Sequence, residues 1–409
     1  MAPSPTRSLH RPDLPVGRPQ ARSLGFEAYS HPEVYAAERT RLFHPAEGPL
    51  FVSHRSLLDG AGHAAGEADD RVLLTSEDGR VVRAFANVCT HAMRPLVRSR
   101  ERLTQACVTC PYHLWSFRRD GSFIGGPGMV LDPDQRAALA LREFPLVEWR
   151  GSFFAGAAAA GEAFQRDLAL VDEAFVALGR ADWLDFADWQ LVAAEEEVYP
   201  GDWKSFMEVY GDCYHVPPFH DGLASFADCD TLQWTFGESV HLQALRLSAE
   251  QGRRSANYTA WCDGLRRYYE LRGEPEPELA VVWSAFYPNL MIEYYNGLRV
   301  ISVLVPQGPD SYLNRVRYYV PADMEELVPG LPAAIIAAYG ETEVQDKVLN
   351  ESRHQGLVMA AELGLDASTY LPNLSGPQPE LGTVHFHTWW RRRMNWPSEG
   401  ARGVEVTLR

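Results

Sequence analysis

The chain has 409 residues, of which 46% are hydrophobic and 22% are charged. This length corresponds to two or three domains of ordinary globular composition, which excludes small disulfide-stabilised folds and disordered chains. The formal net charge of -16 opposes contact with phosphate backbones, so no nucleic-acid partner is expected. The longest uncharged apolar stretch, residues 279–292, contains Pro288 and is too short to cross a bilayer, so no membrane span is expected either.

Residues 1–45 are expected to form an N-terminal arm and helix. The first two dozen residues contain five prolines and four arginines but no apolar core, so they are predicted to be a flexible arm rather than a secretion signal. The six cysteines of the chain are too few and too unevenly spaced for a disulfide framework, which favours a cytoplasmic protein.

Residues 46–160 are predicted to form a small all-β domain, because short β-branched and aromatic runs alternate there with glycine-containing turns. A connecting helical segment is expected over residues 161–190, where apolar side chains recur at helical spacing, at Phe164, Leu168, Val171 and Phe175. The remainder, residues 191–409, is predicted to be an α+β domain. Its expected elements are strands at 191–198, 280–287, 298–305 and 313–320 and a helix at 324–363.

Two cysteine–histidine pairs stand in the expected all-β domain. Cys89 and His91 form a Cys-x-His pair, and Cys110 and His113 form a Cys-x-x-His pair. Two thiolates and two neutral imidazoles can hold a structural zinc or a [2Fe-2S] cluster. Zinc fingers usually place their histidines together after the cysteines, whereas each loop here contributes one of each type. The spacing therefore favours the mixed ligation of a Rieske cluster.

In these two motifs the chain resembles the Rieske proteins. The resemblance implies that Cys89 and Cys110 ligate one iron and that His91 and His113 ligate the other. Rieske proteins of respiratory complexes carry an additional cysteine in each loop, and both are absent here, which points to the lower-potential branch that serves oxygenases. Leu114 stands where these oxygenases commonly have glycine.

A second group of candidate metal ligands follows in the expected α+β domain. His215 and His220 flank Pro217 and Pro218. On a continuous helix the two histidines would point about 140° apart, but the prolines are expected to end the helix and allow them to converge on one metal. Asp212, three residues before His215, is expected to share its helical face and to hydrogen-bond its ring.

Asp346 is the candidate third ligand of this metal. In the predicted final helix it shares a face with Leu349, Arg353 and Leu357, and an acid among leucines indicates an inward-facing ligand. Two histidines and one carboxylate would leave positions open for dioxygen on ferrous iron. The alternative is that Asp346 only pairs with Arg353 and that the two histidines are loop residues bonded to backbone groups.

Together these residues resemble the oxygenase (alpha) component of Rieske non-haem iron oxygenases, the ring-hydroxylating and choline monooxygenase-like family. The resemblance spans residues 70–360 and implies a small all-β Rieske domain followed by a helix-grip (START-like) α+β catalytic domain with an antiparallel sheet. It also implies that His215, His220 and Asp346 hold a mononuclear Fe(II), usually in a homotrimer.

In this family Asp212 matches the bridging acid, and it is the predicted catalytic residue. It would link His215 to His113 of the partner subunit and give electrons a short route between the metals. A separate flavin and iron–sulfur reductase, or a ferredoxin, is expected to supply electrons from NAD(P)H. The chain itself has no dinucleotide fingerprint, because the glycine-rich residues 125–128 contain a misplaced proline.

The expected activity is that of a terminal oxygenase, mono- or dioxygenase, that hydroxylates or oxidatively demethylates a small organic substrate. An aromatic cage for a betaine- or choline-like cation is one interpretation of the aromatic-rich stretch, and an ordinary core is the other; the stretch comprises Trp261, Tyr268, Tyr269, Trp283, Phe286, Tyr287, Tyr294 and Tyr295. An aromatic or natural-product skeleton is an equally open substrate. The alternative functions are a Rieske electron-transfer protein and a helix-grip ligand-binding protein without oxygenase activity.

Overall fold

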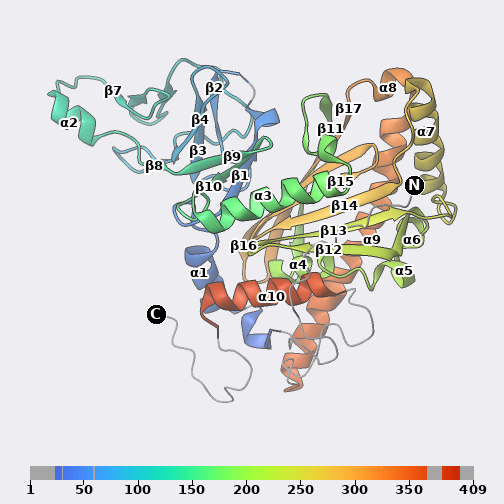
Figure 1. Ribbon diagram of the computed structural model, residues 1–409. Coiled ribbons are helices and arrows are strands. Elements are labelled where there is room, and N and C mark those ends of the chain that lie inside the picture. Colours follow the sequence, from blue (N-terminus) through green and yellow to red (C-terminus); the bar gives the residue numbers. More distant parts are fainter. Residues whose placement is uncertain (1–23, 30, 59, 366–379, 397–409) are drawn as a thin grey trace. The chain divides into compact units, whose positions relative to one another are not determined.

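The computed structural model describes residues 24–29, 31–58, 60–365 and 380–396 (Figure 1). The first 23 residues, predicted to be a flexible arm, lie outside this part of the chain. The chain divides into two compact units. We call residues 40–168 the small unit, and residues 1–39 together with 169–409 the large unit.

The small unit is built from three antiparallel sheets, as predicted for an all-β domain. The first sheet contains β1 (Leu50–His54), β10 (Ser152–Ala155) and β9 (Leu146–Trp149). The second contains β2 (Gly62–Ala65), β3 (Val72–Ser76), β4 (Val82–Ala86) and β8 (Glu143–Phe144). The third contains β5 (Val108–Thr109), β6 (Ser116–Phe117) and β7 (Phe123–Gly125).

The small unit also contains short helices. They are η2 (Arg55–Leu57), α2 (Pro133–Ala138) and the first part of α3 (Glu162–Ala177). The helix α3 confirms the predicted connecting helix, because all four of its periodic apolar residues, Phe164, Leu168, Val171 and Phe175, are buried.

A seven-stranded antiparallel sheet forms the centre of the large unit (Figure 1), in the order β11-β17-β16-β15-β14-β13-β12. Its strands are β11 (Trp189–Pro200), β12 (Ala227–Phe236), β13 (Val240–Leu247), β14 (Leu279–Phe286), β15 (Leu290–Tyr295), β16 (Leu298–Gly308) and β17 (Ser311–Pro321). The four predicted strands correspond to β11, β14, β16 and β17. Every residue of β14 and β15 is buried, so both faces of the central sheet are covered.

The helices of the large unit combine with this sheet in the predicted helix-grip fold. They are η1 (Phe26–Ala28), α1 (Pro32–Arg41), η3 (Ala181–Leu184), α4 (Trp203–Tyr210), α5 (Val216–Phe219), α6 (Asp221–Phe226), α7 (Ala256–Arg272), α8 (Met324–Leu327), α9 (Leu331–Glu362) and α10 (Leu381–Met394). One hydrophobic core joins α7 and α9 to the sheet, with Trp261, Leu265, Ile335 and Ala338 from the helices and Val281, Val300 and Val316 from the strands.

The prediction of one helix over residues 324–363 is wrong, because the chain forms two helices there, α8 and α9. Pro329 separates them and has no N–H to donate. Gly330 adopts a left-handed backbone with φ of 83°, which an L side chain would resist. The long helix α9 therefore begins only at Leu331.

A buried ionic cluster ties α1 to the start of α4. Glu38 accepts hydrogen bonds from Trp203 Nε1 at 2.9 Å, Trp390 Nε1 at 2.7 Å and Lys204 Nζ at 2.7 Å. Lys204 also contacts Asp202 at 2.8 Å and is completely buried. Burial lowers the pKa of Lys204, but Asp202 and Glu38 outweigh it and raise this pKa overall. The helix that leads to the candidate iron ligands is therefore held by the N-terminal helix and by α10.

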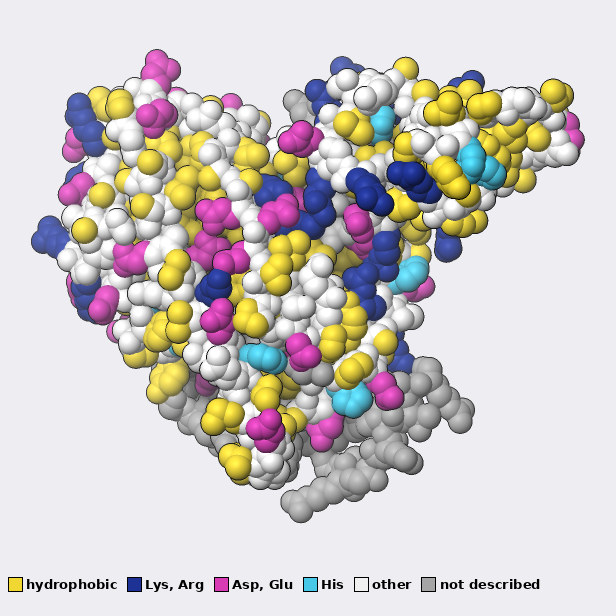
Figure 2. Space-filling view, turned by 180° about the vertical axis from the view of Figure 1, so that it is seen from behind, with side chains coloured by type: hydrophobic (Ala, Val, Ile, Leu, Met, Phe, Trp, Pro, Cys, Tyr) yellow, Lys and Arg dark blue, Asp and Glu magenta, His cyan; other side chains and the backbone are white. Residues whose placement is uncertain are grey.

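The two units differ in charge. Residues 40–168 contain 15 arginines, no lysine and 15 acidic side chains, so the net charge of -16 belongs to the remainder of the chain. Figure 2 shows one face of the molecule, on which Asp and Glu side chains gather in a group among hydrophobic ones. None of the described helices is long and apolar enough to cross a membrane.

Candidate functional site

The two loops that carry the cysteine–histidine pairs share one backbone conformation. In each loop the cysteine carbonyl accepts a hydrogen bond from the N–H four positions later, at 3.1 Å for Cys89 and 3.0 Å for Cys110. The cysteine N–H donates to the carbonyl five positions later, at 2.8 Å in both loops. Both turns need a left-handed residue, with φ of 57° at Met93 and 58° at Leu114. The chain thus forms the same tight turn twice.

Burial separates the four predicted cluster ligands into two pairs. Cys89 and Cys110 are 1% exposed and lie in one hydrophobic cluster, whereas His91 and His113 are exposed. The two imidazole rings lie 4.5 Å apart between centroids, and Trp115, which was not predicted, stacks on His91 at 4.5 Å. One pair of thiols and one pair of imidazoles is the donor set of a Rieske cluster, in which each iron takes two like ligands.

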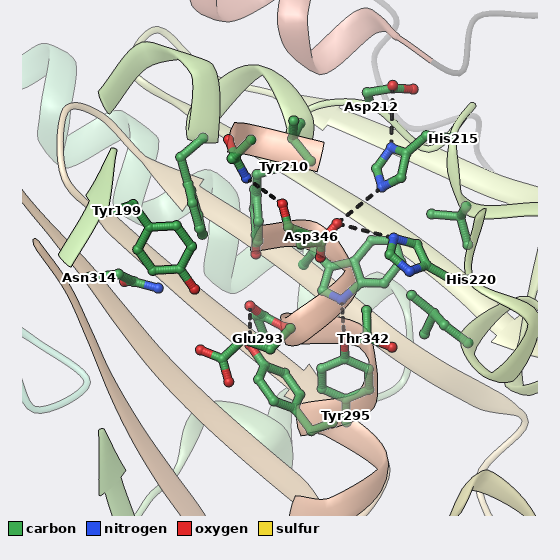
Figure 3. A pocket seen from close by; sticks show the side chains of 18 residues that line it. Tyr199, Tyr210, Asp212, His215, His220, Glu293, Tyr295, Asn314, Thr342 and Asp346 are labelled. Atoms are coloured by element: carbon green, nitrogen blue, oxygen red, sulfur yellow. Dashed lines mark hydrogen bonds and ion pairs between the residues drawn. The ribbon is translucent and has the colours of Figure 1, made fainter. Parts of the chain in front are cut away.

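The large unit brings together the three predicted iron ligands (Figure 3). His215 and His220 flank α5, and Asp346 lies on α9. One ligand atom of each lies within 4.8 Å of the other two. Asp346 Oδ1 is 3.5 Å from His215 Nε2 and 3.0 Å from His220 Nε2. Two imidazoles and one carboxylate aimed at one point fit Fe(II) with positions left open.

The other ring nitrogen of each histidine has an acceptor nearby. Asp212 Oδ2 lies 3.3 Å from His215 Nδ1, and Gln345 Oε1 lies 2.7 Å from His220 Nδ1. Acceptors at Nδ1 keep a proton there and leave Nε2 free to bind a metal. The contact from Asp212 was predicted. The contact from Gln345 was not predicted, although Gln345 directly precedes Asp346 in the chain.

The pKa values of His215 and Asp346 depend on their charged neighbours. Burial lowers the pKa of His215, but Asp212 and Asp346 outweigh it and raise this pKa to about 9. Burial raises the pKa of Asp346, but His215 and His220 outweigh it and lower this pKa below its usual value. The Asp346 carboxylate is therefore ionised at neutral pH, as a metal ligand must be.

The local structure around the histidines differs from the prediction. The helix α4 ends before Asp212, so Asp212 and His215 lie in a turn and not on one helical face. Asp212 is positioned because its carboxylate accepts a hydrogen bond from the N–H of Tyr214 at 2.5 Å. Pro217 and Pro218 begin α5 instead of ending a longer helix, since proline is tolerated in a first turn, where N–H groups have no intrahelical partner.

Arg353 does not pair with Asp346, as the alternative interpretation required. It forms an ion pair with Glu208 of α4. Glu208 is buried and also accepts hydrogen bonds from Tyr29 and, at 2.6 Å, from His387 Nε2. Burial raises the pKa of Glu208, but Arg353 and His387 outweigh it and lower this pKa to about 2. One carboxylate therefore joins α4, α9, α10 and the N-terminal segment.

A pocket of about 680 Å³, its open mouth included, lies beside the predicted iron ligands (Figure 3). Four carboxylates line it, and none of the described lining residues is Lys or Arg. These acids are Asp212, Glu293, Glu343 and Asp346. Six aromatic rings form much of the remaining wall, from Tyr199, Phe206, Tyr210, Trp283, Tyr295 and Tyr339.

The predicted aromatic stretch contributes only partly to this pocket. Trp283 and Tyr295 line it, whereas Trp261 and Tyr268 are buried in the hydrophobic core of the large unit. The acid Glu293 was not singled out from the sequence. One sequence feature could have revealed it, because Glu293 is an acidic residue in an otherwise apolar strand. It stands two residues before Tyr295 and therefore lies on the same face of β15.

The sequence matches two known domain families. Residues 181–396, just over half of the chain, match the catalytic domain of the ring hydroxylating alpha subunits, and residues 51–145 match the Rieske [2Fe-2S] domain. The putrescine 2-hydroxylase of Ralstonia nicotianae is 32% identical over 92% of this chain and 97% of its own length. The choline monooxygenase of Spinacia oleracea is 25% identical over 96% of this chain and 83% of its own length.

Solved structures share the fold. The quaternary ammonium Rieske monooxygenase CntA aligns with a TM-score of 0.72 at 18% identity, over 92% of this chain and 96% of its own. Naphthalene 1,2-dioxygenase aligns with a TM-score of 0.67 at 18% identity, over 97% and 96%. These matches confirm the predicted fold. The chain belongs to the ring hydroxylating alpha subunits, the terminal oxygenase components that use a Rieske [2Fe-2S] cluster, a mononuclear iron, dioxygen and electrons from a separate protein to oxidise a small organic substrate.

Proposed function

We propose that this oxygenase component hydroxylates a C–H bond of a small organic cation. The pocket beside the predicted iron ligands carries the proposal, because it combines four carboxylates and six aromatic rings with no Lys or Arg among the described residues of its lining. Carboxylates attract a cation by Coulomb forces, and ring faces attract it through their quadrupoles. Two relatives support this choice, since putrescine and choline, the substrates in their names, are organic cations.

In this proposal His215, His220 and Asp346 hold the mononuclear iron, which supplies the activation of dioxygen at its open positions. Asp212 and Gln345 orient the two imidazoles through their Nδ1 atoms. His220 is 1% exposed, and the aromatic wall of the pocket restricts bulk water around the substrate. The [2Fe-2S] cluster is assigned to Cys89, Cys110, His91 and His113.

We further propose that the active form is a homotrimer, in which Asp212 links His215 to the partner subunit's His113. Apolar side chains are exposed around the cluster loops, with Met93 at 69%, Tyr112 at 59% and Leu114 at 58%. A solved structure of a quaternary ammonium Rieske monooxygenase is described as giving insights into inter-subunit electron transfer. Exposed apolar groups beside a redox ligand favour burial against another subunit.

The electron donor in this proposal is a flavin and iron–sulfur reductase, or a ferredoxin, that draws electrons from NAD(P)H. We propose that the proteins meet in the cytoplasm. All six cysteines are free of disulfide bonds, which suits a reducing compartment.

Metal analysis and product analysis of the full chain test the proposal. We expect about three iron atoms and two sulfides per chain and a Rieske signal in electron paramagnetic resonance of the reduced protein. His215→Ala and Asp346→Ala should each lose one iron and keep this signal. With a reductase, NADH and a panel of amines, mass spectrometry should detect a product that carries one added oxygen atom.

Two outcomes would contradict the proposal. If the iron content is unchanged in both variants, His215 and Asp346 are not ligands of the mononuclear iron. If the protein oxidises neutral aromatic compounds and no organic cation, it is still an oxygenase, but the proposed class of substrate is wrong.

A further inference from the structure

Two of the pocket carboxylates have no cationic partner. Asp346 contacts both histidines, and Asp212 contacts His215. The other two acids, Glu293 and Glu343, form no ion pair with Lys, Arg or His in the described part of the chain. With Fe(II) bound by two neutral imidazoles and one carboxylate, these two glutamates remain as carboxyl groups without a cationic partner inside one pocket.

Glu293 lies deep in the pocket, on the central strand β15, and is 6% exposed. Its Oε1 accepts a hydrogen bond from the Tyr339 hydroxyl at 3.0 Å. The hydroxyl of a second tyrosine, Tyr295, lowers the pKa of this carboxyl group, and it accepts a hydrogen bond from Trp283 Nε1 at 2.8 Å. These hydroxyls fix the carboxylate and still leave it lone pairs, because an ionised carboxylate has about four acceptor positions.

Glu343 lines the same pocket from α9 and is partly exposed. The Tyr318 hydroxyl donates to its Oε2 at 2.8 Å. The same hydroxyl lies 3.3 Å from Glu195 on the exposed strand β11. Glu343 therefore lies between the enclosed part of the pocket and an acidic, solvent-exposed edge of the sheet.

Three pocket residues lie at regular intervals along the helix α9. Tyr339, Glu343 and Asp346 line the pocket from successive turns of this helix. At 1.5 Å per residue, Glu343 is about 4.5 Å and Tyr339, which contacts Glu293, about 10.5 Å from Asp346 along the axis. The helix therefore places Glu343 about one turn, and the tyrosine that contacts Glu293 about two turns, from the candidate iron ligand Asp346.

We infer that Glu293 and Glu343 are two ammonium subsites and that the substrate is a short aliphatic diamine that occupies both, with its carbon chain beside the iron. This inference rests on the proposed function and narrows its substrate class. The pocket offers two carboxyl groups without a cationic partner, and a diamine brings two positive charges that favour the ionised form of both.

The hydrogen-bonding chemistry favours primary ammonium groups over quaternary ones. A primary ammonium has three N–H donors, which can satisfy the free lone pairs of Glu293 together with neighbouring hydroxyls. A quaternary ammonium has no N–H and would leave a buried carboxylate without a hydrogen-bond donor from the ligand, which is costly. A choline-like substrate would also leave one of the two glutamates without a cation.

Binding to the iron-loaded full chain under anaerobic conditions tests the inference. Calorimetry with 1,4-diaminobutane, 1-aminobutane and choline should show the diamine bound at least about tenfold more tightly than the other two, because a second charged hydrogen-bonded contact is worth this much or more. Equal affinities for the monoamine and the diamine, or tightest binding of choline, would overturn the inference.

Isosteric variants then test whether each glutamate binds one ammonium group of the diamine. At pH 9, where both side chains are carboxylates, Glu293→Gln and Glu343→Gln should each weaken diamine binding by about 10- to 100-fold. For 1-aminobutane only one of the two variants should weaken binding, since a monoamine fills one subsite. Glu195→Gln is the matched control, because Glu195 is exposed beside the same Tyr318 hydroxyl and should change affinity by less than about twofold. Loss of diamine affinity in the control equal to that in Glu343→Gln would overturn the assignment.

Product analysis separates failure of this inference from failure of the proposed function. If monoamines or choline are hydroxylated as efficiently as the diamine, the oxygenase still acts on organic cations but the two-subsite inference is wrong. If no cation is hydroxylated, the proposed substrate class itself is wrong.

Discussion

The two candidate metal sites expose their histidines very differently. In the small unit His91 and His113 are exposed while Cys89 and Cys110 are buried. In the large unit the ring of His220 is 1% exposed, and the pocket walls surround it. A site that receives and passes on electrons needs ligands within reach of another protein, whereas a site that oxidises a C–H bond benefits from the exclusion of water. The difference in exposure follows the difference in task.

The two sites also differ in what positions their ligands. In the small unit two short loops repeat one backbone turn, so each Cys–His pair is set by local hydrogen bonds. In the large unit the ligands come from a turn, the end of α5 and the distant helix α9. The first site is therefore specified mainly by its own loops, and the second depends on the packing of the whole unit.

The largest expected effect tests whether the two sites work together across subunits. His113→Ala should block electron transfer through the cluster, and Asp346→Ala should lose the mononuclear iron. Each variant alone should therefore be inactive. Oligomers that contain both variants should regain activity, because an intact cluster on one subunit can serve an intact iron on the next. Turnover of doubly tagged, tandem-purified oligomers with reductase and NADH measures this.

A mixture of His215→Ala with Asp346→Ala is the matched control for complementation. Both variants lack the iron site, so their mixed oligomers should stay inactive. Failure of the His113→Ala and Asp346→Ala mixture to regain activity, although each variant keeps its remaining metal, would contradict transfer between subunits.

The second prediction concerns the side chain that orients His220. In Gln345→Ala the Nδ1–H of His220 loses its acceptor at 2.7 Å, so we expect affinity for the mononuclear iron to fall by about 10- to 100-fold. The cluster content and its spectrum should not change, because the small unit specifies its own ligands. Iron titration against a chelator measures this effect.

Gln355→Ala provides the control for that titration, since Gln355 lies on the same helix and is exposed. We expect its iron affinity to equal that of the unchanged protein. Equal iron affinity in Gln345→Ala and Gln355→Ala would show that the imidazole does not depend on its Nδ1 partner.

The contrast between local and distributed sites also explains what the sequence could predict. The spacing of Cys89, His91, Cys110 and His113 reports directly on two loops, because the loops are continuous in sequence. Asp346 was recognised because an acid on an apolar helical face is unusual, and the structure places it beside both histidines. The fold class followed from the family resemblance that these motifs carry.

Features that depend on packing between distant elements could not be predicted in this way. The helix boundary near Asp212 was wrong because a pair of prolines can begin a helix as well as end one. Gln345 and Glu293 were missed because their partners, His220 and Tyr339, come from other elements. Neither contact has a signature in the spacing of residues along the chain.

The third prediction uses pH to test the charge of the deep subsite. Burial raises the pKa of Glu293 to about 8, so the neutral acid predominates at pH 7 and the carboxylate at pH 9. The titratable groups that face it are Glu343, Asp346 and Tyr339 of α9, Tyr295 of β15 and Tyr210 of α4. Since an alkylammonium stays protonated up to about pH 10, ionisation of Glu293 should raise the affinity for 1,4-diaminobutane about tenfold from pH 7 to 9, and ionisation of Glu343 should raise it about twofold more.

In Glu293→Gln most of this rise should disappear. Burial raises the pKa of Glu343 to about 7, so a rise of about twofold should remain from its ionisation. Calorimetry across this pH range measures both curves. An affinity that rises equally in the unchanged protein and in Glu293→Gln would show that Glu293 does not bind the ammonium as a carboxylate.

The smallest expected effect concerns the repeated turn of the small unit. Leu114 has a φ of 58°, a conformation that costs an L residue about 1 kcal/mol or more. Leu114→Gly removes this strain but adds about 0.5–1 kcal/mol of chain entropy to the unfolded state, so the free energy of unfolding should stay level or rise by up to about 1 kcal/mol. Loss of cluster absorbance during unfolding of the full chain reports on this unit.

Val130→Gly is the matched control, because Val130 is 98% exposed and has no left-handed strain to release. It should lower the free energy of unfolding by about 0.5–1 kcal/mol. An equal loss in Leu114→Gly would mean that contacts of the leucine side chain outweigh its backbone strain. A gain in stability with a loss of coupled turnover would instead indicate that Leu114 is kept in a strained turn for its contact with a partner subunit.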